Sequence, residues 1–182
     1  MNDAMKEKIF KARSRYDEQV DKLLEEVSMQ REESLNRQPG NGWSALQTIH
    51  HLILVEANSL AYVQKKLSYH PALARAGAGG HWRSFLLWAG LNIPLKFKAP
   101  RSVGDEQLPK TSSLSEIREN WQRTRDAWQD FLDQLPYEQA DKAVYRHPRA
   151  GRLSWIQMFD FFRYHLQRHR LQIRRAIRFS QS

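Results

Sequence analysis

Cysteine is absent from the 182-residue sequence. Its absence excludes disulfide frameworks, thiolate zinc sites and cysteine nucleophiles, so any metal site must use histidine, carboxylate or water. Long apolar runs are also missing, because the longest weakly polar run (85–95) falls short of the ~20 residues that span a bilayer. The charged N-terminal residues lack the apolar stretch of a signal peptide. We therefore expect a cytoplasmic protein with no membrane association.

The rest of the composition is that of an ordinary globular protein. Hydrophobic residues make up 41% of the chain and charged residues 27%, which argues against global disorder. A chain of this length corresponds to about one domain, at ~150 residues per domain. The sequence contains no internal repeat and no low-complexity tract, and we predict a single domain over residues 1–182.

Acidic residues are nearly absent from the last fifth of the chain. The net charge is +9, and residues 142–182 contain ten basic residues and one acidic residue, Asp160. Such a basic stripe attracts phosphates and other anions. The simpler interpretation, which we favour, is a solvated helix face whose arginines complement the helix dipole. No nucleic-acid-binding signature accompanies the charge, so nucleic acid is not an expected partner.

Helical periodicity appears four times along the chain, and no convincing strand is present. Apolar residues at spacings of three and four predict the four helices. These helices are expected over 5–27, 44–68, 113–135 and 155–179. Ser44 and Ser113 each precede a glutamine or glutamate by three residues, which is the spacing of a capping box. The second helix is apolar on more than one side and should be the most buried.

A long connection separates the second and third predicted helices. Proline and glycine interrupt residues 70–111, so we expect them to be largely irregular, with one short apolar helix over 81–91. Four amphipathic helices with one such crossover predict an all-α four-helix bundle. The long, partly helical connection allows helices two and three to run parallel.

His165 and His169 have the most informative spacing among the seven histidines. They lie four residues apart in a predicted helix, so both rings leave the same face, which also carries Phe161 and Phe162. Inward-pointing imidazoles need partners, because a buried unsatisfied polar group costs roughly 1–3 kcal/mol. A shared metal would satisfy both, and so would hydrogen bonds to the backbone. A metalloprotease is disfavoured, because Leu166 stands where the helical zinc-protease motif requires glutamate.

A third metal ligand would have to come from the second predicted helix, where His50 and His51 are adjacent. Adjacent helical residues diverge by about 100°, so at most one of the two should face the site. His51 shares a face with Asn58 and Tyr62, which could line a polar cavity, whereas His50 lies nearer the apolar stripe. The pattern alone favours His51 only slightly.

The segment 42–52, GWSALQTIHHL, resembles the opening of helix two in the DinB-like four-helix bundles, a family that includes YfiT-like metal proteins. In that family a metal-ligand histidine follows the tryptophan of a Trp-Ser/Thr pair by eight residues. His51 stands eight residues after Trp43, so the resemblance selects His51 over His50.

The loop 147–154, HPRAGRLS, and the helix that follows it are similar to the last part of the same family. Two histidines four residues apart complete the family's ligand set, and His165 and His169 match them. A glutamine follows three residues later in the family, as Gln172 does here. The two motifs occur in the family's order, and the helical plan covers nearly the whole chain.

The resemblance implies a divalent metal, zinc or nickel, held by His51, His165 and His169 with an open position for solvent. Gln172 would hydrogen-bond a ligand imidazole. His147 would either reach the pocket as an acid–base group or simply shape its loop, and we favour the second role. Trp43 is interpreted as a core anchor.

The expected function is that of a metal-dependent hydrolase or a thiol-dependent transferase with a small anionic substrate, such as a low-molecular-weight thiol. The basic side chains nearest the ligands in sequence favour an anion. They are Arg146, Arg149, Arg152 and Arg168. The alternative is a non-enzymatic, stress-associated binding or scaffold bundle.

We further expect the stretch 71–109 to border the metal site or to form a homodimer interface, because Trp82, Phe85, Leu86 and Trp88 are too apolar to face water.

Overall fold

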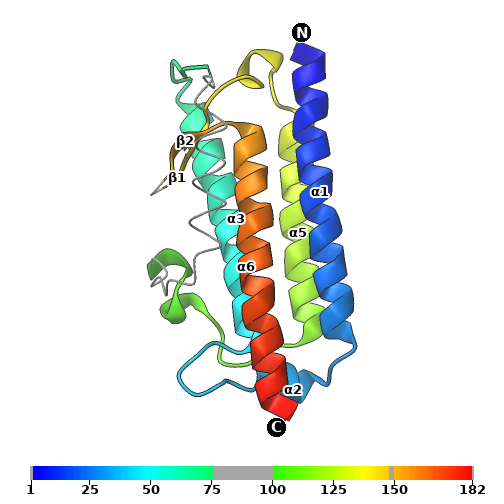
Figure 1. Ribbon diagram of the computed structural model, residues 1–182. Helices are drawn as coiled ribbons and strands as arrows, with labels where there is room; N and C mark the ends of the chain where they lie inside the picture. Colours follow the sequence, from blue (N-terminus) through cyan, green and yellow to red (C-terminus); the bar gives the residue numbers. More distant parts are fainter. Residues whose placement is uncertain (1, 76–100, 148–149, 182) are drawn as a thin grey trace.

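The computed structural model describes residues 2–75, 101–147 and 150–181 (Figure 1). The chain is mostly helical, which confirms the predicted all-α class. Its elements, in chain order, are α1 (Asn2–Ser28), α2 (Glu32–Asn36), α3 (Ala45–Ser68), the 3-10 turns η1 (Arg101–Val103) and η2 (Asp105–Gln107), α5 (Leu114–Asp133), η3 (Tyr137–Gln139), the strands β1 (Tyr145–His147) and β2 (Gly151–Leu153), and α6 (Trp155–Gln181).

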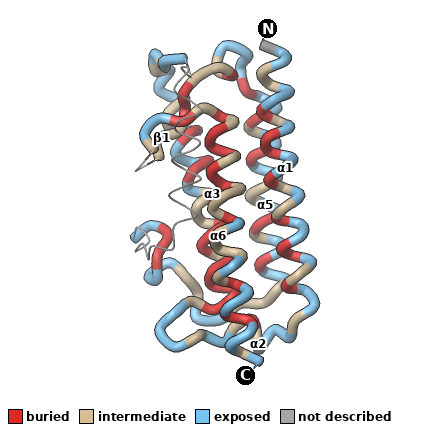
Figure 2. Tube along the Cα trace, viewed as in Figure 1, coloured by how far each residue is buried: buried red, intermediate tan, exposed pale blue. Residues whose placement is uncertain are grey.

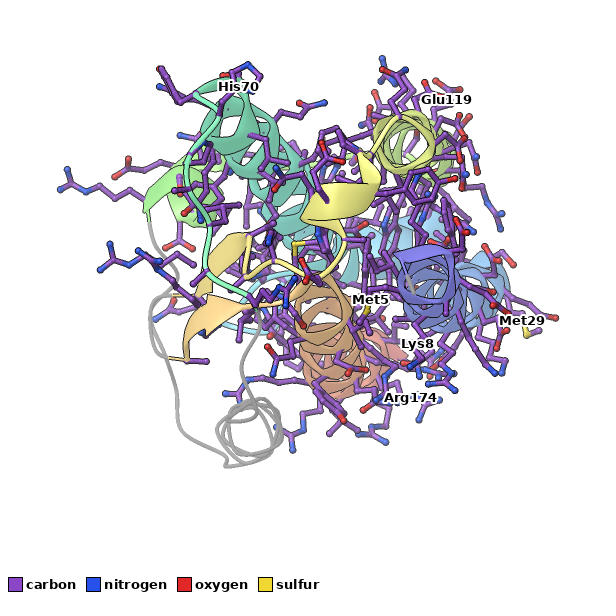
Figure 3. The ribbon with its side chains drawn as sticks, turned by 90° about the horizontal axis from the view of Figure 1, so that it is seen from above. Met5, Lys8, Met29, His70, Glu119 and Arg174 are labelled. Atoms are coloured by element: carbon purple, nitrogen blue, oxygen red, sulfur yellow. The ribbon has the colours of Figure 1, made fainter. Side chains whose placement is uncertain are left out.

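The four long helices α1, α3, α5 and α6 form the bundle. Figure 1 shows α1 and α6 running in one direction and α3 and α5 in the other. A parallel α3–α5 pair requires a long connection, which is what the sequence predicts between these helices. Seen from above, the four helices surround a filled interior, in which α6 packs against both α1 and α3 (Figure 3).

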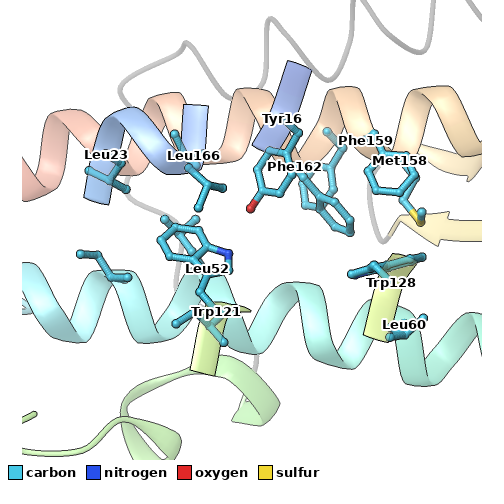
Figure 4. Packing of buried hydrophobic residues seen from close by; sticks show 14 of the residues in the cluster. Tyr16, Leu23, Leu52, Leu60, Trp121, Trp128, Met158, Phe159, Phe162 and Leu166 are labelled. Carbon is cyan, nitrogen blue, oxygen red and sulfur yellow. The ribbon is translucent and has the colours of Figure 1, made fainter. Parts of the chain in front are cut away.

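Large aromatic side chains fill this interior. Trp121, Trp128 and Trp155 are each at most 1% exposed, and the buried residues follow the inner faces of the helices (Figure 2). The Trp128 ring lies 5.4 Å from that of Phe159 and 6.1 Å from that of Phe162, in the edge-on arrangement that aromatic pairs prefer (Figure 4). Burial of each such side chain contributes roughly 1.5–3 kcal/mol, so the amphipathic pattern determines the fold.

Two helix starts follow the local sequence as predicted. The Ser44 hydroxyl accepts the backbone N–H of Gln47, whose side chain in turn accepts the backbone N–H of Ser44. Ser113 and Glu116 form the same reciprocal pair at the start of α5. Each capping box satisfies two backbone donors that a helix N-terminus would otherwise leave unpaired, and so fixes where α3 and α5 begin.

The segment before α6 is a β-hairpin, whereas the sequence led us to expect a loop. β1 and β2 pair antiparallel, with Tyr145 opposite Leu153 and Arg146 opposite Arg152. Gly151 has a φ of 72°, a left-handed conformation that glycine adopts without strain. Strands of three residues are too short to show an alternating pattern, so neither strand could be predicted from the residues.

The hairpin and the turns η1 and η2 lie on the outer side of the α3–α6 pair (Figures 1 and 3). The expected helix over 81–91 and its apolar residues Trp82, Phe85, Leu86 and Trp88 lie outside the described residues. Within the described ranges, no helix is long and apolar enough to cross a bilayer.

Candidate metal centre

Three histidines from two helices meet between α3 and α6. The Nε2 atom of His165 lies 3.4 Å from Nε2 of His51 and 3.0 Å from Nε2 of His169. One nitrogen atom of each of the three rings lies within 4.8 Å of the others. The structure thus brings together the three residues that the sequence and the resemblance singled out; their role as ligands stays a prediction.

Helix geometry explains how these rings meet. His165 and His169 are one turn apart on α6, so their side chains leave the same face and their ring centroids lie 4.5 Å apart. Phe161, one turn earlier, stacks on His165 at 5.3 Å and closes one side of the cluster. His51 is 4% exposed and reaches the pair from the buried face of α3.

Hydrogen bonds behind the rings determine which nitrogens face the centre. Nδ1 of His51 lies 2.7 Å from the carbonyl oxygen of Val103, and Nδ1 of His169 lies 3.0 Å from Oε1 of Gln172. Both oxygens can only accept, so each Nδ1 carries the proton and donates. The Nε2 lone pairs of His51 and His169 therefore point into the cluster. The partner expected for Gln172 is confirmed.

Burial keeps the three imidazoles neutral at neutral pH. It lowers the pKa of His51, holds the pKa of His165 well below its usual range, and lowers the pKa of His169 to about 3. The neighbouring imidazoles and the Arg168 guanidinium add to the effect on His165 and His169. Neutral imidazole is the form that binds a metal ion.

The cluster offers three nitrogen atoms at separations that a metal ion could bridge. Two ligands of a tetrahedral ion at about 2.0–2.1 Å lie about 3.3 Å from each other, which agrees with the observed separations of 3.0 and 3.4 Å between Nε2 atoms. The inward lone pairs of His51 and His169 need an electron-poor partner; a metal ion would serve both of them, whereas an Nε2–H of His165 would serve only one. Within the described residues the cluster contains only the three histidines, so an ion held there would keep positions for solvent or a ligand.

His50 faces away from this cluster. Its Nε2 atom lies 2.9 Å from the hydroxyl of Ser112, just before α5. The divergence of adjacent helical residues therefore separates the two histidines as expected, and His51 is the one that joins His165 and His169. The family resemblance also indicated His51 and not His50.

Trp43 is not the core anchor that the sequence led us to expect. Its ring is partly exposed and lies 5.0 Å from the ring of His51, and its indole N–H donates to the Asp105 carboxylate. Tryptophan often keeps its N–H at a wet edge, where a polar partner satisfies it. The position just outside the Ser44 cap places the ring beside the cluster and not inside the bundle.

His147 closes the hairpin turn, because its Nδ1 accepts the backbone N–H of Ala150 at 3.1 Å. This bond agrees with the loop-shaping role that we favoured. The His147 ring also lies 4.6 Å from Phe161, the residue that stacks on His165. The hairpin therefore borders the histidine cluster through Phe161.

Positive charge gathers on the hairpin. Arg146 and Arg152 stand opposite each other in the hairpin. Burial lowers the pKa of Lys66 on α3, and the positive charges of Arg152 and Arg146 lower it further. The Lys66 ammonium also donates to the carbonyl oxygen of Val144 at 2.8 Å. Of the four arginines expected near the ligands, Arg149 lies outside the described residues.

Two contributors to the site gave no sequence signal. Val103 acts through its backbone carbonyl, so its side-chain identity could not reveal it. Asp105 is an exposed acid in an irregular segment, and only its distant partner Trp43 gives it a role. Both belong to the expected stretch 71–109, whose described end therefore does border the cluster.

A comparison with protein families matches the model of the DinB superfamily over residues 12–173, which is most of the chain. No curated protein and no solved structure gives a match.

Proposed function

This chain belongs to the DinB superfamily, and we propose that it binds one divalent metal ion through His51, His165 and His169. The proposal rests on the direction of the Nε2 lone pairs of His51 and His169. Hydrogen bonds from Nδ1 leave Nε2 of His51 and of His169 as acceptors, and both face Nε2 of His165 at contact distance. Both acceptors converge on Nε2 of His165 in a buried site, where one cation could satisfy all three nitrogens while an Nε2–H of His165 could satisfy only one of the two acceptors.

Zinc or nickel is the metal that the family resemblance implies, and the ligand set is compatible with either. Three imidazole nitrogens match the ligand preference of zinc, copper, iron and nickel, whereas calcium and magnesium prefer oxygen. When bound with an open position, such an ion supplies Lewis-acid activation of a thiol or of water. This chemistry suits a hydrolase or a thiol-dependent transferase. The chain's own contribution is to keep the imidazoles neutral and oriented.

A small anionic molecule is the substrate class that we propose. Arg146 and Arg152 lie on the hairpin and act on Lys66 near the end of α3, and Arg168 is close enough to the cluster to act on its imidazoles. A low-molecular-weight thiol that carries carboxylates would place its sulfur at the metal and its charge on the hairpin.

Metal analysis of protein purified without an affinity tag tests the metal proposal. We expect about one zinc or nickel ion per chain in the wild type and in the H50A variant, and strong loss of metal in the H51A, H165A and H169A variants. H50A is the matched control, because it removes a neighbouring imidazole that faces Ser112. A metal-free H50A variant together with a metal-loaded H51A variant would show that the wrong histidine was chosen.

Calorimetric binding of glutathione, a thiol with two carboxylates, tests the substrate class. We expect binding that weakens as salt is added, and that R146A weakens further. The matched control is R178A, which removes an exposed arginine from the last turn of α6. A ligand screen that returns only neutral or cationic binders would contradict the proposal. Metal binding without turnover of any thiol or ester would favour the non-enzymatic alternative.

A further inference from the structure

The segment formed by η1 and η2 (101–107) is attached to α3 and its cap at three points. The carbonyl oxygen of Val103 accepts Nδ1–H of His51, and the side-chain amide of Asn58 donates to the carbonyl oxygen of Ser102 at 3.1 Å. Asp105 accepts the indole N–H of Trp43. All three partners are more than forty positions away in the chain, so these contacts are tertiary and determine where the segment lies.

Trp43 connects two of these points. Its ring packs against the imidazole of His51 at 5.0 Å between centroids, inclined by 43°, while its N–H is held by Asp105. The indole therefore lies between the carboxylate of the segment and the ring of the proposed ligand. A Trp43 side chain released from Asp105 would be free to leave His51, and the segment would lose one of its attachments.

We propose that Trp43 and Asp105 are a pair of positioning residues for His51. Together they hold the carbonyl of Val103 behind Nδ1 of His51, which fixes Nε2 as the nitrogen presented to His165 and His169. This inference rests on the metal site proposed above. It adds that the segment 101–107 and the metal site are thermodynamically coupled, because a ligand held in one tautomer and one orientation binds the ion better. The coupling is reciprocal, so the ion should in turn stabilise the docked segment.

The metal-free protein provides the first test. Two-dimensional NMR of imidazole nitrogens should show His51 with its proton on Nδ1 in the wild type. The D105A and W43F variants should shift His51 toward a mixture of tautomers, because the first lacks the acceptor and the second lacks the donor. The E106A variant removes the neighbouring exposed acid and should leave the wild-type spectrum. A wild-type His51 with its proton on Nε2, or unchanged spectra in D105A and W43F, would overturn the inference.

Metal affinity provides the second test. D105A and W43F should each weaken zinc binding about fivefold, as expected for the loss of one ordinary hydrogen bond. The double variant should bind zinc no more weakly than either single variant, because both changes remove the same contact. D105N keeps an acceptor and should restore near-wild-type affinity, and E106A should have no effect. Additive losses in the double variant, or equal losses in E106A and D105A, would overturn the inference.

The two tests separate this inference from the metal proposal. A wild-type protein that binds no zinc would refute the metal proposal, while the NMR measurement would still decide whether Trp43 and Asp105 orient His51. A wild-type protein that binds zinc with unchanged affinity in D105A and W43F would refute the positioning pair alone.

Discussion

Replacing Glu56 by glutamine should remove a strong pH dependence from the stability of the bundle. Glu56 lies in the middle of α3, is 2% exposed, and points into the core. One of its carboxylate oxygens accepts the hydroxyl of Tyr16 from α1 and the indole N–H of Trp121 from α5 at 2.6 Å. Figure 4 shows Tyr16 and Trp121 reaching into the same interior space. Burial raises the pKa of Glu56 to about 8, although both hydrogen bonds act in the opposite direction.

The size of the effect follows from the two protonation states. In the unfolded chain the carboxyl releases its proton near its ordinary pKa of 4.5, whereas the folded protein keeps it up to about pH 8. Below pH 4.5 both states are protonated, and the favourable contribution of the neutral carboxyl is fully present. Between these values the folded state holds more protons, so the free energy of unfolding falls by about 1.4 kcal/mol per pH unit. The contribution is lost above about pH 8, for a total on the order of 5 kcal/mol.

Urea unfolding of the wild type and of E56Q, measured from pH 5 to pH 8.5 in the presence of a chelator, isolates this contribution. The amide oxygen of glutamine can still accept from Tyr16 and Trp121, but it does not titrate. The stability of E56Q relative to the wild type should therefore increase by about 4 kcal/mol across this range. The matched control is E106Q at an exposed glutamate, which should show no such trend. A difference in unfolding free energy between E56Q and the wild type that stays constant from pH 5 to pH 8.5 would show that Glu56 does not titrate in this way.

Three further results are expected. Q172A should weaken zinc binding roughly tenfold to a hundredfold in calorimetric titrations, because Gln172 orients His169. An unchanged zinc affinity in Q172A would count against that role. E26Q should lower the free energy of unfolding by about 1 kcal/mol at pH 7, since Arg174 and Arg170 both donate to Glu26 and lower its pKa. This loss should shrink as the pH falls below the ordinary pKa of 4.5 and through the lowered folded-state pKa, and a loss that stays constant throughout the acid range would contradict this origin. Replacing 76–100 by a short flexible linker should preserve helix content by circular dichroism but change ligand binding or oligomeric state, and a folded variant with both properties unchanged would make the segment a spacer.

The four long helices were predictable because their sequences carry repeated signals, whereas the five-residue helix α2 was not predicted. Apolar residues recur at steps of three and four over many turns, and the serine caps at Ser44 and Ser113 mark where two of the helices begin. The placement of His165 and His169 on one helix face was also predictable, because the geometry of a helix alone determines it. Short-range rules of this kind need no knowledge of the tertiary fold.

Features that depend on distant partners were not predictable from the residues. Glu56 stands in an apolar helix, and its buried hydrogen bonds come from two other helices. The choice between His50 and His51 also depends on which helices flank α3. The local pattern favoured His51 only slightly, and His51 was identified from the spacing that the family resemblance implies. The hairpin and the hydrogen bond to the carbonyl of Val103 were not predicted, because three-residue strands show no alternation and a backbone carbonyl does not depend on the type of side chain.

The most direct test of the central claim is a crystal structure of the tag-free protein soaked with zinc or nickel, with data collected at the absorption edge of the metal. We expect one strong anomalous peak per chain, about 2.0–2.1 Å from Nε2 of His51, His165 and His169. No peak among the three imidazoles, or a peak held by His50 or His147 in their place, would contradict it.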